Sequence, residues 1–357
     1  MIKSFDEVFE DVTKLGVKIK TDEYHPIGKY QIIDQGQEAV AGYSDLEDGV
    51  FENVPAIVFG DHTRIVKYVD QPFFLGADGV KVLRSRFKDA NYRYLYYALK
   101  SVKIPNTGYN RHFKWLKEAK IYYPNSEEQS KIVLILDEIS SVIEHRQRQL
   151  QKLDELVKAR FVELFGDCKS MVSMNELCSI ITDGTHQPPR FQESGIPFIF
   201  VSNLVGNVVT YNAEKFISED TYAELYKRTP IEIGDLLLST VGSYGHPAVV
   251  TEDRKFLFQR HIAYLKPRHN MVNSFYLHSA LLAPDGQRQI EEKVKGIAQK
   301  TLNLSEIKKI VVPLPTIEEQ NQFEKFVNQI DKSKVAVQKA LDEAQLLFDS
   351  LMQKYFG

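Results

Sequence analysis

Residues 126–166 have the sequence SEEQSKIVLILDEISSVIEHRQRQLQKLDELVKARFVELFG. Positions taken alternately four and three apart from Ile132 are mostly aliphatic over more than four heptads. This spacing is typical of a coiled-coil seam, which is narrower than the apolar stripe of an ordinary amphipathic helix. We therefore predict one long helix, with the seam formed by Ile132, Leu136, Ile139, Ile143, Arg146, Leu150, Leu153, Val157, Arg160 and Leu164.

The same pattern recurs 191 residues further along the chain. Both copies follow a proline and both end in Phe-Gly. Each copy has the signature of an N-terminal capping box, Ser126 with Gln129 and Thr316 with Glu319. The repeat predicts a second long helix, with its seam formed by Phe323, Val327, Ile330, Lys334, Val337, Leu341, Ala344, Phe348, Leu351 and Tyr355.

Three charged residues, Arg146, Arg160 and Lys334, interrupt the two seams. Their long stems can cover apolar surface while the charges reach water. Alternatively, a polar seam position can select the register of two paired helices. The sequence leaves both interpretations open.

The bulk composition is that of a soluble globular chain. A length of 357 residues suggests two domains or two copies of one, and the hydrophobic content is 43%. No apolar run is long enough to span a membrane, and the N-terminus lacks a signal-peptide pattern. The two cysteines, Cys168 and Cys178, make no disulfide or metal framework. We expect a cytoplasmic protein with no membrane partner.

The formal net charge of −3 gives no electrostatic signal for nucleic-acid binding. Residues 1–123 contain 18 basic and 17 acidic side chains, and residues 167–313 contain 16 of each. The negative balance therefore lies in the two helical segments. A near-neutral total leaves room for a local basic face.

Short apolar runs separated by Gly, Asp and Pro predict strands and turns in residues 1–123 and 167–313. We expect helices over residues 4–15, 91–99 and 290–294. We also expect a helix over residues 274–282, as the counterpart of 91–99, and a loop at 296–302, as the counterpart of the loop near Gly108.

The predicted fold class is α+β, with an internal pseudo-two-fold repeat. Two globular segments of mixed strands and short helices alternate with two helices of about 60 Å. Because an isolated helix with such a seam would aggregate, the two copies should form an antiparallel coiled coil. The predicted boundaries are residues 1–123 (first globular segment), 124–166 (first helix), 167–313 (second globular segment) and 314–357 (second helix).

This layout resembles the specificity subunit of Type I restriction-modification systems. The resemblance covers essentially the whole chain and rests on the repeated order of motifs, since none of them is specific alone. The motifs are Ile33-Asp-Gln-Gly-Gln37, Ala41-Gly-Tyr43, Phe59-Gly-Asp-His-Thr63 and Gly76-Ala-Asp-Gly79 in the first half, and Asp183-Gly-Thr-His186, Ile196-Pro-Phe198, Gly234-Asp-Leu-Leu237 and Gly296-Ile-Ala-Gln-Lys-Thr301 in the second.

The resemblance implies a non-catalytic DNA-binding subunit. Each globular segment would be a target recognition domain for one half of a split site on double-stranded DNA, and the coiled coil would set the spacer. Two methyltransferase subunits would dock on it, and restriction subunits would join them. S-adenosylmethionine, ATP and Mg²⁺ would then belong to the partner subunits, with no cofactor in this chain.

Base edges are recognised by polar side chains on loops, so the DNA-contact candidates are chosen there. For each candidate the alternative interpretation is a solvent-exposed loop residue that makes no DNA contact. The turn Gly242-Ser-Tyr-Gly245 has two interpretations, a phosphate site formed by backbone N–H groups or an ordinary β-hairpin turn. The candidates are Gln35, Gln37, His62, Arg64, Asn110, Arg111, His186, Gln187, Arg190, Ser243, Tyr244, His246, Arg260 and Lys300.

Catalytic motifs do not emerge from the sequence. Gln187-Pro-Pro-Arg190 differs from the Asn/Asp-Pro-Pro-aromatic motif of amino-methyltransferases, and there is no Walker loop. The nine histidines lack metal-ligand spacing. The alternative function is a coiled-coil scaffold whose globular domains bind proteins rather than DNA.

Overall fold

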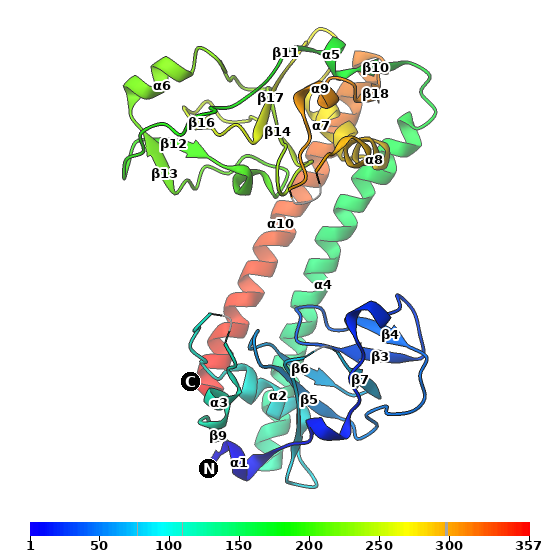
Figure 1. Ribbon diagram of the computed structural model, residues 1–357, viewed down its shortest axis with the longest axis vertical. Helices are drawn as coiled ribbons and strands as arrows, with labels where there is room; N and C mark the ends of the chain where they lie inside the picture. Colours follow the sequence, from blue (N-terminus) through cyan, green and yellow to red (C-terminus); the bar gives the residue numbers. More distant parts are fainter. Residues whose placement is uncertain (77, 109, 297–298) are drawn as a thin grey trace. The chain divides into compact units, whose positions relative to one another are not determined.

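The computed structural model describes residues 1–76, 78–108, 110–296 and 299–357. Ala77, Tyr109, Ile297 and Ala298, which fall in the predicted loops, lie outside the described residues. The chain forms two compact units, shown in Figure 1. Unit 1 comprises residues 1–147 and 339–357, and unit 2 comprises residues 148–338.

The two predicted long helices are present and pack antiparallel (Figure 1). Helix α4 spans Ser126–Phe165 and α10 spans Ile317–Phe356, each with 40 residues, and every boundary repeats after 191 residues. In unit 1 the start of α4 shares a core with the end of α10, through Ile132, Leu136 and Phe348. In unit 2 the end of α4 shares a core with the start of α10.

The seam matches the structure along nearly all of both helices. Every predicted seam position of α10 is buried or partly buried, and so is every one of α4 except Leu164, which is 47% exposed. Phe161 and Phe165, each 4% exposed, face inward in its place. An α-helix drifts by about 20° per heptad relative to a strict 3.5-residue repeat, so the buried column moves to the neighbouring positions by the last turn.

The capping box forms at α10 but not at α4. The Glu319 carboxylate accepts hydrogen bonds from Thr316 N at 2.9 Å and Thr316 Oγ1 at 2.8 Å. At α4 the prediction for Ser126 with Gln129 is wrong, because Asn125 is the cap and its Oδ1 accepts from Glu128 N at 2.9 Å. Gln129 is instead buried and donates to the Pro124 carbonyl at 3.0 Å.

Unit 1 contains a four-stranded antiparallel sheet and a three-stranded mixed sheet. Strand β3 pairs antiparallel with β4 and parallel with β7. In spatial order the strands are β2 (Phe9–Asp11), β8 (Val80–Ser85), β5 (Ala56–Gly60) and β6 (Val66–Val69), and then β4 (Gly42–Ser44), β3 (Tyr30–Ile33) and β7 (Phe73–Leu75).

Unit 2 repeats this topology strand for strand. Its four-stranded sheet is antiparallel, and β12 pairs antiparallel with β13 and parallel with β16. The internal repeat therefore extends from the helices into the globular segments. The strands are β11 (Cys178–Asp183), β17 (Ile262–Pro267), β14 (Leu236–Ser239) and β15 (Pro247–Val249), and then β13 (Lys215–Ile217), β12 (Ile196–Ile199) and β16 (Leu257–Phe258).

Short helices and two strand pairs join the sheets to the long helices. Strand β1 (Ile2–Ser4) pairs with β9 (Lys120–Tyr122), and β10 (Met171–Ser173) pairs with β18 (Val311–Pro313). The helices are α1 (Phe5–Val8), α2 (Tyr92–Lys100), α3 (Phe113–Lys117), α5 (Met174–Leu177), α6 (Glu219–Leu225), α7 (Ser274–Leu282), α8 (Pro284–Lys293) and α9 (Leu304–Ile307), with 3₁₀ turns at Thr13–Leu15, Thr21–Glu23 and Val201–Leu204.

The predicted helix over residues 4–15 is wrong. Only α1 and the 3₁₀ turn Thr13–Leu15 are helical there, because Phe9–Asp11 between them pairs with β8 in the four-stranded sheet. The predicted helices at 91–99 and 274–282 correspond to α2 and α7, which each begin after an asparagine cap. Among the described residues, no helix is long and apolar enough to cross a lipid bilayer.

Candidate nucleic-acid interface

Loops from distant parts of unit 1 meet around the side chain of Gln35. Its Nε2 donates to the Asp78 carbonyl at 3.0 Å, and its Oε1 accepts from His62 N at 3.2 Å. Its own carbonyl accepts from Thr63 Oγ1 at 2.6 Å. Gln35 therefore joins the β3–β4 loop, the β5–β6 turn and the β7–β8 turn.

The loop between α2 and α3 is fastened to the same turn by a buried aspartate. Asp61 is 3% exposed, and its carbonyl accepts from His112 N at 2.8 Å. Its Oδ1 accepts from Phe113 N at 2.7 Å. Arg64, which has a positive φ of 65°, donates from Nη1 to the Ile104 carbonyl at 3.4 Å. Four loops of unit 1 thus share one edge.

The six candidate residues of unit 1 all lie on these four loops. Gln35, His62 and Arg64 contact neighbouring loops, whereas Gln37, Asn110 and Arg111 are exposed. Lys18 pairs with the exposed Asp78 at 2.6 Å. This bond, and the Arg111 charge to a smaller degree, lowers the pKa of Asp78. The negative charge of Asp78 is therefore balanced by neighbouring basic side chains of unit 1.

A matching group of loops is present in unit 2. Arg260 N donates to the Thr185 carbonyl at 3.1 Å, Thr240 N to His261 O at 2.9 Å, and Leu302 N to Thr240 O at 2.8 Å. The β11–β12 loop, the β14–β15 turn, the β16–β17 turn and the α8–α9 loop are thereby linked. A polar cavity of about 270 Å³ between them is lined by Asp183, Thr240, Val241, Arg260, His261, Gln299, Thr301, Leu302, Asn303 and Leu304.

Two candidate residues of unit 2, His186 and Lys300, lie against carboxylates. Asp183 lies 2.9 Å from His186 Nε2 and 2.7 Å from Arg228 Nη2. Lys300 Nζ lies 2.9 Å from Glu291, which also accepts a hydrogen bond from the Tyr244 hydroxyl. Gln187, Arg190 and Ser243 are exposed on the same loops.

The glycine-rich turn at residues 242–245 has the geometry of a hairpin connection. Gly242 and Gly245 have positive φ values of 73° and 82°, which glycine adopts without steric cost. Their amides donate to Lys300 O at 3.4 Å and Ser239 O at 2.9 Å. Because these two N–H groups are already used, the hairpin interpretation is favoured over a phosphate cradle.

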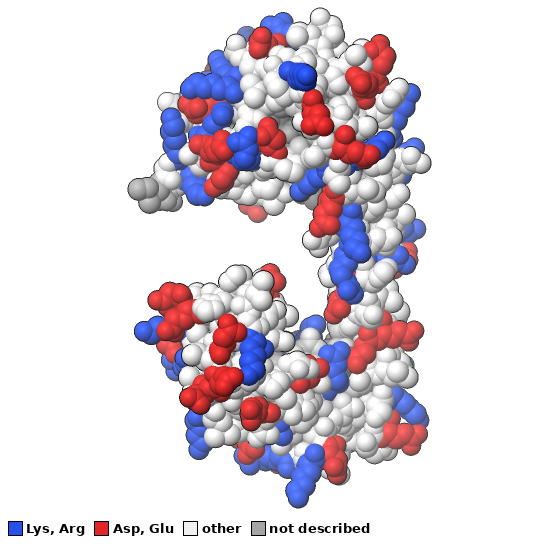
Figure 2. Space-filling view, turned by 90° about the vertical axis from the view of Figure 1, so that its right-hand side faces the viewer, with Lys and Arg blue, Asp and Glu red and all other residues white. Residues whose placement is uncertain are grey.

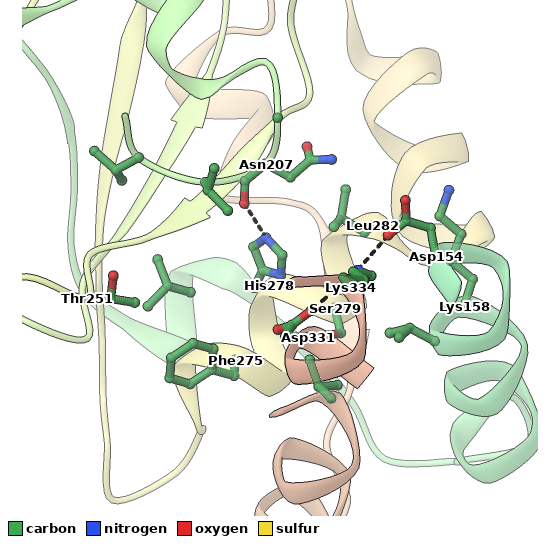
Figure 3. A pocket seen from close by; sticks show the side chains of 16 residues that line it. Asp154, Lys158, Asn207, Thr251, Phe275, His278, Ser279, Leu282, Asp331 and Lys334 are labelled. Carbon is green, nitrogen blue, oxygen red and sulfur yellow. Dashed lines mark hydrogen bonds and ion pairs between the residues drawn. The ribbon is translucent and has the colours of Figure 1, made fainter. Parts of the chain in front are cut away.

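The polar seam positions differ in what they contact. Lys334 Nζ on α10 lies 2.6 Å from Asp154 on α4 and 3.3 Å from Asp331 (Figure 3). Burial opposes the charge, but the carboxylates outweigh it and raise the pKa of Lys334. Arg160 pairs with Glu163 on its own helix at 2.8 Å. Register selection therefore fits Lys334, whereas Arg160 makes a contact along one helix.

Three residues that contact the described loops from within them or from neighbouring loops, Asp61, Asn207 and Arg228, were missed by sequence reasoning. Asp61 stands inside a motif that was recognised, but a buried anchoring carboxylate cannot be told from a solvated one by pattern. Asn207 follows Gly206, and such a pair marks a turn. Arg228 lies in a polar stretch that gives no signal. Their contacts are all long-range: Asp61 with Phe113, Asn207 with His246, and Arg228 with Asp183.

The surface carries mixed charge. On the face in Figure 2, basic and acidic side chains are interspersed, in line with the near-neutral totals of the sequence. Within the described part of the chain, no three His, Cys, Asp or Glu side chains are grouped so as to bind a metal ion.

The two units have one topology. Each has converging polar loops and is built onto paired long helices. This arrangement defines a modular recognition protein with two related domains. The fold matches that of the Type I restriction-modification S subunit from M. genitalium, with a TM-score of 0.52, 18% identity, and coverage of 100% of this chain and 96% of that one. The chain belongs to the Type I restriction modification DNA specificity domain family, whose model matches residues 1–155 and 170–344.

Curated relatives agree with this assignment. The EcoBI specificity subunit of Escherichia coli is 32% identical over 177 residues, which cover 48% of this chain and 37% of that protein. The EcoR124I/EcoR124II specificity subunit of Escherichia coli is 21% identical over 356 residues, which cover 90% of this chain and 84% of that one. The chain is thus a DNA specificity subunit of a Type I system, which is the non-catalytic subunit.

Proposed function

We propose that residues 1–123 and 167–313 are target recognition domains that each recognise one half of a bipartite site on double-stranded DNA. The observation that carries this proposal is the repeated topology with unlike loops. The β5–β6 turn contains Asp61-His-Thr63, whereas the equivalent β14–β15 turn contains Ser243-Tyr-Gly-His246. Different side chains on equivalent turns suit two different half-sites.

The exposed polar side chains of the converging loops would contact the bases. In unit 1 these are Gln37, Asn110 and Arg111, and in unit 2 they are Gln187, Arg190 and Ser243. Gln35 and His62 would position the loops, because the Gln35 side chain and the backbone N–H of His62 form hydrogen bonds with neighbouring loops. The remaining candidates would either hold the base-contacting loops in place or contact DNA phosphates, which position a protein without specifying sequence. They are Arg64, His186, Tyr244, His246, Arg260 and Lys300.

The long helices α4 and α10, which lie within residues 124–166 and 314–357, would fix the spacer between the half-sites. Each has 40 residues and is therefore about 60 Å long. Two domains attached to such helices cannot slide independently along DNA. Binding of one half-site then raises the effective concentration of the other domain at its own half-site.

Two methyltransferase subunits would dock on equivalent surfaces. Leu156 on α4 is 46% exposed, and Leu347 on α10, at the same position of the repeat, is 51% exposed. An exposed leucine repeated by the internal symmetry fits two copies of one partner. Restriction subunits would complete the complex. S-adenosylmethionine, ATP and Mg²⁺ would be bound by these partners.

Methylome sequencing of a host that carries this chain and its methyltransferase tests the proposal. We expect one bipartite, asymmetric motif with a fixed gap. Binding of the complex to this motif should weaken steeply as salt rises, because phosphate contacts release counterions. Methylation without a split motif, or binding that ignores both salt and sequence, would instead support a protein-binding scaffold.

A further inference from the structure

Asn207 bonds to two histidines that lie on different elements of unit 2. Its Oδ1 lies 3.1 Å from Nδ1 of His246 in the β14–β15 turn. Its backbone carbonyl lies 3.0 Å from Nε2 of His278 on α7 (Figure 3). The other ring nitrogen of His246, Nε2, lies 3.1 Å from Ser243 Oγ. A continuous hydrogen-bonded chain therefore leads from α7 to the exposed hydroxyl of Ser243.

The backbone of Asn207 is built for this position. It has a positive φ of 58°, a conformation that asparagine tolerates better than most residues. Its N–H donates to the Leu204 carbonyl at 2.8 Å, which closes a turn. The neighbouring Asn203 fixes the remainder of the loop through Thr210 and Asn212. The side chain of Asn207 is thus presented to His246 from a fixed backbone.

The donors and acceptors of the chain determine one another. The Oδ1 atom of Asn207 can only accept, so Nδ1 of His246 carries the hydrogen. A neutral imidazole then has no hydrogen on Nε2, and this atom accepts from the Ser243 hydroxyl. Partial burial lowers the pKa of His246, which favours the neutral ring. The single hydrogen of the Ser243 hydroxyl is therefore committed to His246, and its oxygen is left as an acceptor.

We infer that Asn207 is a positioning residue which, through His246, makes Ser243 a hydrogen-bond acceptor toward DNA. A side chain that can only accept selects a base that donates in the major groove. The donors there are the amino groups of adenine (N6) and cytosine (N4). Ser243 would accordingly prefer one of these two bases at its position of the second half-site. The inference rests on the proposed function and adds the chemical class of the base.

The test uses methylomes of complexes with single variants of this chain. Asn207→Gly keeps the backbone conformation but removes the acceptor, and Ser243→Ala removes the hydroxyl. Asn212→Gly, which keeps the backbone carbonyl that Asn203 contacts, is a matched control at an exposed site of the same loop. We expect Asn207→Gly and Ser243→Ala to relax the same single base by about fivefold, the value of one hydrogen bond. Asn212→Gly should leave that base unchanged.

A second measurement is independent of the variants. The ¹⁵N chemical shifts of the His246 ring in the full-length chain should report hydrogen on Nδ1 and none on Nε2. The opposite tautomer would overturn the inference, as would relaxation of different bases by Asn207→Gly and Ser243→Ala. If the wild type gives a bipartite motif and Asn207→Gly leaves this motif unchanged, the inference is refuted but the proposed function is not. Absence of any bipartite motif in the wild type refutes the proposed function and the inference together.

Discussion

Lys334 on α10 and Asp154 on α4 form an ion pair across the two long helices, with Nζ 2.6 Å from Oδ1. It is the only lysine on either predicted seam, and it occupies the position where the repeat would otherwise place an aliphatic residue such as Ile143. A charge at this position bonds only when the helices pair in one register. Apolar neighbours accept several registers, so the pair adds specificity more than stability.

A double-mutant cycle with Lys334→Ala and Asp154→Ala should measure the coupling of this pair. Because the side chains are 29% and 61% exposed, we expect only about 0.5–1 kcal/mol in the free energy of unfolding. The coupling should shrink at 1 M salt. The pair Arg160 and Glu163, on one helix, serves as a control with about 0.3–0.5 kcal/mol. No measurable coupling for Lys334 would contradict a role in register.

Neighbouring residues at the end of α4 should differ strongly in their effect on stability. Phe165 is 4% exposed and packs against Tyr276 and Phe323 with ring centroids 5.1 and 5.6 Å apart. Phe165→Ala should lower the free energy of unfolding by about 3–5 kcal/mol. Leu164→Ala should cost less than about 1 kcal/mol, because this side chain is 47% exposed. Equal losses in denaturant unfolding would contradict the packing described here.

The two cysteines should react at very different rates. Burial raises the pKa of the Cys178 thiol to about 12, and this residue is 4% exposed, whereas Cys168 is partly exposed. Since the thiolate is the reactive form, iodoacetamide should add one group to the native chain and two to the unfolded chain, as seen by intact mass. The Cys168→Ser variant should add none while folded. Rapid labelling of that variant would show that Cys178 is accessible.

The stability of unit 2 should fall in mild acid through His278. Burial lowers the pKa of His278 below its ordinary value of 6.5, so below that pH the unfolded chain binds a proton that the folded chain does not. The free energy of unfolding therefore decreases as pH drops through and below 6.5. His278→Gln should flatten this dependence, whereas His269→Gln, at an exposed position, should not. An unchanged pH slope in the His278 variant would contradict the assignment.

The repeat could be predicted because it is a local pattern written twice. The 3.5-residue spacing predicted both long helices, and with them the α+β fold class. The errors are equally local in origin. Serine and asparagine can both cap a helix, and only the hydrogen bond from Glu128 N to Asn125 Oδ1 distinguishes Asn125 from Ser126.

The recognition loops were only partly predictable. Polar residues on turns could be selected by type, but their partners could not. The sequence predicts Gln35 as a DNA contact by residue type, but it does not show that the Gln35 side chain forms hydrogen bonds with Asp78 and His62, which are 43 and 27 residues away. Asn207 was not chosen, since its bond to His246 spans 39 residues. Such pairings follow from strand order, which a single sequence does not show.

The central claim is that each globular segment recognises its own half of the DNA site, and exchange of one segment tests it most directly. Residues 1–123 are replaced by the corresponding segment of another specificity subunit, and the methylome of the host is sequenced. We expect one half-site to change while the other half-site and the gap stay as they were. A change in both half-sites would contradict it.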